Sequence, residues 1–379
     1  MAHLPPPLRR RIADLHSWIG AVAALFIIVA SLTGGVIAMA SHLMHAETGA
    51  LPRDVGPAPA LPDLDGYLDA AQAEAGPEFI ALGYLGPDAE IATPVGMVWG
   101  LSAPPDGGGR EQIVTLDPAT GDALGTFFLY DTLTHALIDF HAELLAGPVG
   151  AVLMAVLGLL MGALALAGLV LAKPLRRTAR GTASRRWHRV AGVWLAVPVL
   201  LWGVSGAYWS QPDWARGFAP FPADLTAAQT ARLSATCGNT VSATPVSANQ
   251  ALATATTAIG ADASLVLREA EFEVPWQPYH LLVFANGTNP DARGGNLRAF
   301  VSASCADVVE LQPIRPAGTV GALLISIHTG EFLGPLRQPA LLVLGLLLAA
   351  ISATGTLMWW RRIRKQRRTR RAALTAVLQ

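Results

Sequence analysis

The chain has 379 residues, of which 52% are hydrophobic and 14% are charged, and its mean hydropathy is +0.41. Soluble domains carry about 25% charged residues, so this composition indicates a membrane protein and excludes a disordered chain. The 27 basic side chains balance 27 acidic ones, and the absence of a net positive charge argues against a nucleic-acid binder.

Four apolar runs without Asp, Glu, Lys or Arg are long enough to cross a bilayer, which takes about 20 helical residues. They cover Ile19–Met39, Gly150–Ala172, Val190–Tyr208 and Ala340–Trp360. Ala38-Met39-Ala40 resembles a signal-peptide cleavage site, but the first run exceeds the roughly 7–15 residues of a signal core. We therefore expect four membrane spans.

The basic residues predict the orientation of these spans. Eighteen of the 27 lie in three short segments next to the runs, together with one acid, Asp14. They are Arg9, Arg10, Arg11, Lys173, Arg176, Arg177, Arg180, Arg185, Arg186, Arg189, Arg361, Arg362, Arg364, Lys365, Arg367, Arg368, Arg370 and Arg371. By the positive-inside rule these segments and both termini are cytoplasmic. The remaining 9 basic and 26 acidic residues make the external segments acidic, which suits cationic or metal-bearing ligands.

The expected fold is a four-helix membrane bundle with two external α+β lobes. Its sections are 1–40 (N-terminus and first span), 41–147 (first lobe), 148–172 (second span), 173–189 (cytoplasmic loop), 190–209 (third span), 210–339 (second lobe), 340–360 (fourth span) and 361–379 (tail). Helices are expected at Leu64–Ala75 and Ser247–Ile259. Strands are expected at Phe79–Leu85, Gly96–Leu101, Gln112–Leu116, Ser264–Phe272, His280–Phe284 and Leu297–Ser302.

The only two cysteines, Cys237 and Cys305, both fall in the second external segment. An even pair in an oxidising compartment predicts a disulfide, and two unpaired thiols are the alternative.

The chain repeats one unit twice. His16, Gly20 and Thr33-Gly34 recur as His188, Gly192 and Ser205-Gly206, at a constant offset of 172. His141, Gly147-Pro148 and Gly168 recur as His328, Gly334-Pro335 and Gly355, at an offset of 187. Internal repeats in membrane proteins often frame a central site.

Four histidines occupy repeated places: His16 and His188 at the inner ends of spans one and three, and His141 and His328 at the outer ends of spans two and four. Imidazole is a good axial ligand of haem iron, and facing helices often hold a haem. Gly20 and Gly192 lie one turn beyond the inner histidines and could make room for a porphyrin, and Gly34 and Gly206 could do so for a second haem. Zinc or copper binding and a proton relay are the alternatives for these histidines.

The other five histidines have weaker signals. His42 and His45 could replace or supplement an outer ligand, although a solvated helix end also explains them. His135 has no counterpart in the second half, His280 falls in an expected strand, and His3 is in a tail.

These motifs resemble the PepSY-associated transmembrane family. The resemblance is carried by the His-x-x-x-Gly starts, by Ile327-His328-Thr329-Gly330-Glu331-Phe332-Leu333-Gly334, by Thr354-Gly355 followed by Met358-Trp359-Trp360-Arg361-Arg362, and by Ile113-Val114-Thr115-Leu116-Asp117-Pro118-Ala119-Thr120-Gly121. It implies external PepSY-like lobes, an inner-membrane location and an iron-related role, since some members are haem-containing ferric-siderophore reductases. It also implies that His16, His141, His188 and His328 are axial ligands of haem b. Pairing by depth predicts two haems, one between His16 and His188 and one between His141 and His328.

The leading hypothesis is an electron conduit that reduces a ferric complex held between the external lobes. The cytoplasmic segments are too short for a flavin or nicotinamide domain, which would need about 100–200 residues. The electron donor is therefore membrane quinol or another protein. A non-enzymatic PepSY membrane protein that binds or regulates a partner, and a transporter of an iron complex, are the alternatives.

Overall fold

The computed structural model describes residues 5–51, 55–59, 61–86, 95–102, 109–172, 182–210, 225–234, 246–260, 265–272, 278–286, 297–305, 309–313 and 320–377. The chain forms two compact units. The helical unit comprises residues 1–38, 137–220 and 320–379, and the sheet unit comprises residues 39–136 and 221–319.

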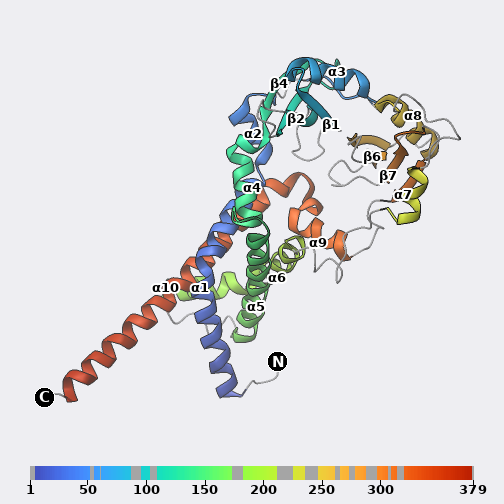
Figure 1. The fold of residues 1–379 in the computed structure, drawn as a ribbon. Coiled ribbons are helices and arrows are strands. Elements are labelled where there is room, and N and C mark those ends of the chain that lie inside the picture. The colour runs from blue at the N-terminus through green and yellow to red at the C-terminus, as the bar shows by residue number, and fades with distance from the viewer. Residues whose placement is uncertain are drawn as a thin grey trace. The chain divides into compact units, whose positions relative to one another are not determined.

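Among its described residues, the helical unit contains four helices that are long and apolar enough to span a membrane. They are α1 (Pro6–Ile37), α5 (Gly147–Leu171), α6 (Ala183–Trp209) and α10 (Arg337–Val377). They correspond to the four apolar runs of the sequence. α1 packs against α10 and α5, and α5 packs against α6. Both chain ends lie at the same end of this unit (Figure 1), where Arg362 of α10 forms an ion pair with Asp14 of α1.

The helices approach one another most closely at paired small residues. A Cβ on Gly158 of α5 would lie 2.5 Å from the carbonyl oxygen of Gly203 of α6, and the reverse substitution would be equally close. A Cβ on Gly345 of α10 would collide with the carbonyl oxygen of Ser31 of α1 and would lie 3.4 Å from Cα of Gly35. Small residues at such crossings allow backbone contact, which stabilises helix pairs in a bilayer.

Two shorter helices carry the outer histidines, which differs from the expectation that these residues begin the second and fourth spans. His141 lies in α4 (Leu133–Glu143) and His328 in α9 (Val320–Thr329). Left-handed residues Leu144, Leu145 and Gly147, with φ of 54°, 56° and 54°, separate α4 from α5. The 3-10 helix η4 (Glu331–Leu336) separates α9 from α10. Each break turns the chain, so that each outer histidine approaches a neighbouring span from the side.

The described part of the sheet unit forms one antiparallel sheet of eight strands in the order β4-β3-β2-β1-β5-β6-β7-β8. The strands are β1 (Phe79–Leu85), β2 (Gly96–Ser102), β3 (Arg110–Leu116), β4 (Ala123–Phe128), β5 (Leu265–Glu271), β6 (Tyr279–Asn286), β7 (Leu297–Ser302) and β8 (Val309–Pro313). The helices of this unit are α2 (Ala40–Thr48), α3 (Leu64–Ala75), α7 (Ala227–Leu233) and α8 (Ala248–Ile259), and the 3-10 helix η1 covers Leu129–Asp131.

The two external segments therefore share one sheet, where the sequence predicted two separate lobes. β1 pairs with β5, with Gly83 opposite Glu271 and Leu85 opposite Glu269. The helices α3 and α8 bury their apolar sides in one hydrophobic core with strands of both segments (Figure 1). A binding cleft between two lobes is thus replaced by a continuous sheet.

Reciprocal capping joins α3 to α8. Asn249 of α8 accepts the backbone N–H of Leu64, the first residue of α3, at 2.8 Å. Asp65 of α3 accepts the backbone N–H of Ala248, the first residue of α8, at 2.9 Å. Each helix thereby supplies an acceptor for the unpaired N–H groups of the other.

Cys305 is disulfide-bonded. Cys237 and the predicted basic loop residues Lys173, Arg176, Arg177 and Arg180 lie outside the described residues.

Candidate functional site

The four repeated histidines form two pairs within the helical unit. The ring centroids of His16 (α1) and His188 (α6) lie 6.4 Å apart, with an interplanar angle of 74°. Those of His141 (α4) and His328 (α9) lie 6.3 Å apart, with an angle of 39°. These are the two pairs that the sequence predicted from histidines at the same depth of the bundle.

The two pairs lie at different depths of the helical unit. His16 is near the start of α1, whereas His141 contacts Gly34 of the same helix. At 1.5 Å per residue, the 18 residues from position 16 to position 34 span about 27 Å. This separation is close to the thickness of a bilayer core.

Each histidine ring rests on a glycine of another helix. We call that glycine, together with the residue before it, a glycine seat. A Cβ on the glycine would lie 2.8 Å from Cε1 of His141 at Gly34, 2.9 Å from His328 at Gly206, 3.0 Å from His188 at Gly355 and 3.6 Å from His16 at Gly168. Side chains larger than hydrogen would displace the first three rings. The sequence singled out Gly34 and Gly206 as space for a porphyrin, but in the structure a histidine ring fills that space.

Hydroxyl groups in three seats lie against Nδ1 of the seated ring. The distances are 3.1 Å from Thr33 Oγ1 to His141, 3.4 Å from Ser205 Oγ to His328 and 3.3 Å from Thr354 Oγ1 to His188. Nδ1 of His188 also donates to the carbonyl oxygen of Ile351 at 3.1 Å, since a carbonyl only accepts. A ring that donates from Nδ1 has Nε2 free to bind a metal.

Seats form within each half of the repeat, whereas pairs form between the halves. His16 and His141 rest on α5 and α1, both from the first half, and His188 and His328 rest on α10 and α6, both from the second. Each pair then takes one histidine from each half. Both candidate sites therefore need both halves.

The ring spacing fits two histidines that share one metal. Histidine nitrogen binds a metal at about 2 Å, so two rings on opposite sides of one ion have centroids roughly 6 Å apart. Among the described residues, no group of three or more His, Cys, Asp or Glu could hold a metal ion. Two axial histidines fit an iron whose other ligands come from a porphyrin. The residues of both pairs thus fit haem.

The His141–His328 pair is also in the right protonation state for ligation. Burial lowers the pKa of His141, and burial together with the neighbouring His141 lowers the pKa of His328 to about 4. Both rings are therefore neutral, the form of imidazole that binds metals.

The other predicted glycines have open surroundings. A Cβ on Gly192 would have no atom within 4 Å, and one on Gly20 would have only Leu164 at 3.7 Å. The space expected beside the inner histidines is present at both positions. Its use by a porphyrin stays a prediction.

The remaining histidines do not join the pairs. His42 is exposed on α2, while Nδ1 of His45 is buried without a hydrogen-bond partner. His135 packs edge-on against Tyr130 at 4.4 Å. His280 donates from Nε2 to the carbonyl of Val246 at 2.9 Å, and burial lowers its pKa. His280 therefore has a structural role, and His3 lies outside the described residues.

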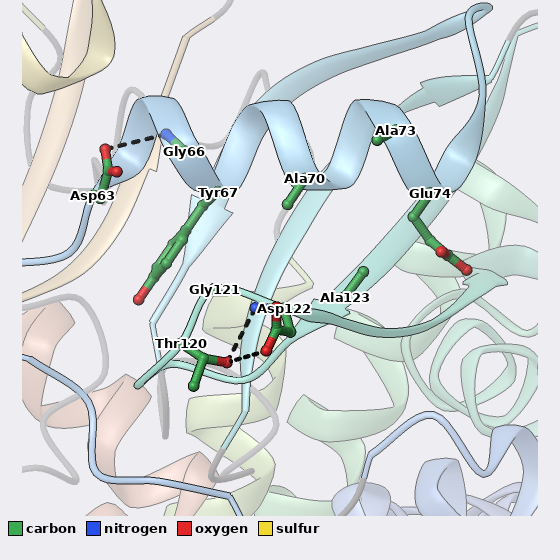
Figure 2. A pocket seen from close by; sticks show the side chains of 10 residues that line it. All are labelled: Asp63, Gly66, Tyr67, Ala70, Ala73, Glu74, Thr120, Gly121, Asp122 and Ala123. Atoms are coloured by element: carbon green, nitrogen blue, oxygen red, sulfur yellow. Dashed lines mark hydrogen bonds between the residues drawn. The ribbon is translucent and has the colours of Figure 1, made fainter.

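The sheet unit has a groove of about 500 Å³ between α3 and the turn from β3 to β4. Figure 2 shows the carboxylates of Asp63 and Asp122 in hydrogen bonds with neighbouring residues. Asp63 accepts the N–H of Gly66 and caps α3, and Asp122 accepts from the hydroxyl of Thr120 at 2.8 Å. The hydrogen bond that Asn249 donates to Asp63 lowers the pKa of the Asp63 carboxyl group. These contacts give Asp63 and Asp122 structural roles.

Sequence reasoning missed two kinds of residue at the pairs. The seat hydroxyls of Thr33, Ser205 and Thr354 belong to the repeated motifs, so their recurrence before glycine was the available signal. Trp202 donates from Nε1 to the carbonyl of His328 at 3.0 Å, and no repeat marks this contact.

No curated protein matches this sequence. The family model described as the PepSY-associated TM region matches residues 13–362, which include the four apolar runs and both histidine pairs. The chain therefore belongs to the PepSY-associated transmembrane family.

Proposed function

We propose that this protein is a haem-containing reductase of the bacterial inner membrane that passes electrons across the bilayer to a periplasmic ferric complex, such as a ferric siderophore. The observation that supports it is the spacing of the two histidine pairs, with centroids 6.4 and 6.3 Å apart. Two haem b groups, when bound, supply the one-electron redox chemistry that the side chains of the pairs cannot perform.

The residues of this chain hold and orient the two sites. His16 and His188 present one ligand set, and His141 and His328 present the other. The seats at Gly34, Gly206 and Gly355 fix three of these rings by close contact. Their placement at two depths of the helical unit provides one site near each face of the membrane. The distribution of basic residues supports a cytoplasmic location for both termini. The short cytoplasmic segments leave no room for a flavin or nicotinamide domain, which supports membrane quinol or another protein as the electron donor.

The acidic external segments suit a cationic or metal-bearing substrate. Ligands selected for ferric iron hold ferrous iron poorly, so reduction would release the metal. This activity would serve iron uptake.

The first experiment measures haem content. Full-length protein purified from haem-replete cells is expected to contain two b-type haems per chain by the pyridine haemochrome assay, with absorption bands that shift on reduction with dithionite. His16→Ala and His328→Ala should each reduce the content to one. His135→Ala is the matched control, because His135 lies on α4 outside the pairs, and it should retain two.

A colourless protein would refute the proposal and favour a non-enzymatic PepSY membrane protein that binds or regulates a partner. If haem is bound, the second experiment uses vesicles that contain the protein and reduced quinol. A ferric siderophore and a ferrous chelator are added outside, and ferrous iron should accumulate only with intact pairs. Uptake of the intact ferric complex without reduction would instead identify a transporter.

A further inference from the structure

One of the four seats differs from the others. The seats of His141, His328 and His188 contain Thr33, Ser205 and Thr354. The seat of His16 contains Ala167 before Gly168, at the position that corresponds to Thr354 by the offset of 187. His16 therefore has no hydroxyl at Nδ1.

The hydroxyl oxygens in the other three seats are arranged to accept a hydrogen bond from the histidine. Thr33 Oγ1 donates to the carbonyl of Ala30 at 3.1 Å or of Val29 at 2.9 Å, and Thr354 Oγ1 donates to Ile351 at 2.9 Å. Ser205 Oγ donates to Trp202 at 3.2 Å. Because each hydroxyl hydrogen is directed to its own helix, the oxygen is left to accept Nδ1–H of the histidine.

Nδ1 of His16 is buried and has no hydrogen-bond partner. The residue that corresponds to Ile351 is Leu164, and no hydrogen bond of the kind that His188 makes to Ile351 is formed at Nδ1 of His16. The contact with the seat glycine is also looser, since the Cβ distance is 3.6 Å at Gly168 and at most 3.0 Å in the other seats. Two independent observations thus distinguish His16.

A hydrogen bond to the outer nitrogen of a ligating histidine fixes the ring and strengthens it as a donor, and losing one costs about 10–100-fold in metal affinity. His188, the partner of His16, has both acceptors, Thr354 and Ile351. The His16–His188 pair therefore combines one strongly held ring with one weakly held ring. All four paired rings are half-buried, so burial does not distinguish the two pairs; the missing hydrogen bond and the looser seat contact distinguish His16.

We propose that Ala167 makes His16 the exchangeable ligand of its pair, so that a small external ligand can replace His16 on the iron while the His141–His328 pair stays closed. The inference rests on the proposed function. It adds a means of regulation, because a ligand bound in place of His16 would control electron transfer at this one site.

The test uses full-length protein reduced with dithionite and exposed to carbon monoxide. Half of the haem should bind carbon monoxide. Ala167→Thr should slow this binding about tenfold or more, and Ala167→Ser, the smaller hydroxyl, should do the same if threonine disturbs packing. Ala163→Thr places the same change on an exposed position of α5 and should leave the rate unchanged. Thr33→Ala should speed carbon monoxide binding at the second haem.

The inference is wrong if both haems bind carbon monoxide equally, if neither does, or if Ala167→Thr and Ala167→Ser leave the rate unchanged. A second readout does not depend on haem. In ¹⁵N-histidine-labelled protein without haem, NMR should show mixed tautomers for His16 and mainly Nδ1–H for the other three, and Ala167→Thr should convert His16 to their pattern. Identical tautomers at all four positions in the unsubstituted protein would overturn the inference whether or not haem is bound. Protein without haem would overturn the proposed function and, with it, ligand exchange at His16.

Discussion

Replacing Gly34 with alanine would place a Cβ 2.8 Å from Cε1 of His141. Ordinary contact begins at 3.4 Å, so the ring would have to retreat by about 0.6 Å. Distances between a metal and its ligands are maintained to about 0.2 Å, so the required displacement is three times the tolerance. We expect Gly34→Ala to lose the haem of the His141–His328 pair and keep the other.

The assay is the haem content per chain, which should fall from two to one. Alanine is about 1 kcal/mol more favourable than glycine inside a helix, so a weakened α1 cannot explain such a loss. Gly168→Ala is the matched control, because its Cβ would lie 3.6 Å from His16, an ordinary contact. Retention of two haems with an unchanged spectrum in Gly34→Ala would refute the reasoning.

Three further predictions concern stability, measured by thermal or denaturant unfolding. Asn249→Ala removes the acceptor that caps α3 and should cost about 1 kcal/mol, whereas Asp69→Ala on the exposed side of α3 should cost less than about 0.5 kcal/mol; equal losses would contradict the capping role. Burial lowers the pKa of His280 from 6.5 in the folded protein, so His280 binds a proton at a higher pH in the unfolded chain than in the folded protein. The free energy of unfolding should therefore fall as the pH drops below about 6.5 toward the folded pKa, by at most about 1.4 kcal/mol per pH unit. His280→Gln should remove that slope, and an unchanged slope would assign it to other groups. Arg362→Ala breaks the half-exposed ion pair with Asp14 and should cost less than about 1 kcal/mol, with little effect left at high salt; a loss of several kcal/mol would show a larger role.

The parts of the fold that were predictable have strong periodic signals. The spans follow from run length, and Leu64–Ala75, Phe79–Leu85 and Leu297–Ser302 have the predicted bounds. The edge strands β4 and β8 were missed. None of the described side chains in β4 is fully buried, so it lacks the alternation of apolar residues that identifies a strand.

The single sheet was not predictable in the same way. β1 and β5 are about 180 residues apart in the chain and join through backbone hydrogen bonds, which leave little trace in side-chain pattern. The separate helices α4 and α9 were missed for a similar reason. Their breaks depend on left-handed backbone at positions that include Leu144 and Leu145, residue types that rarely adopt it.

At the candidate site, the repeat indicated which histidines come together, because equal offsets place equivalent residues at equal depth. It did not reveal what the motif glycines contact. Removing a side chain creates space, but the neighbour that fills that space depends on tertiary packing. A histidine ring packs against Gly34, whereas a Cβ on Gly192 would have no atom within 4 Å.

Each seat forms within one half of the repeat, whereas each histidine pair forms between the halves. This arrangement has an evolutionary consequence. A single ancestral half could hold its two rings but could complete a ligand set only as a homodimer, in which every change appears at both ends of each pair. Duplication and fusion of the gene release that constraint. Ala167 and Thr354, which occupy equivalent positions, are a difference that only the fused chain can encode.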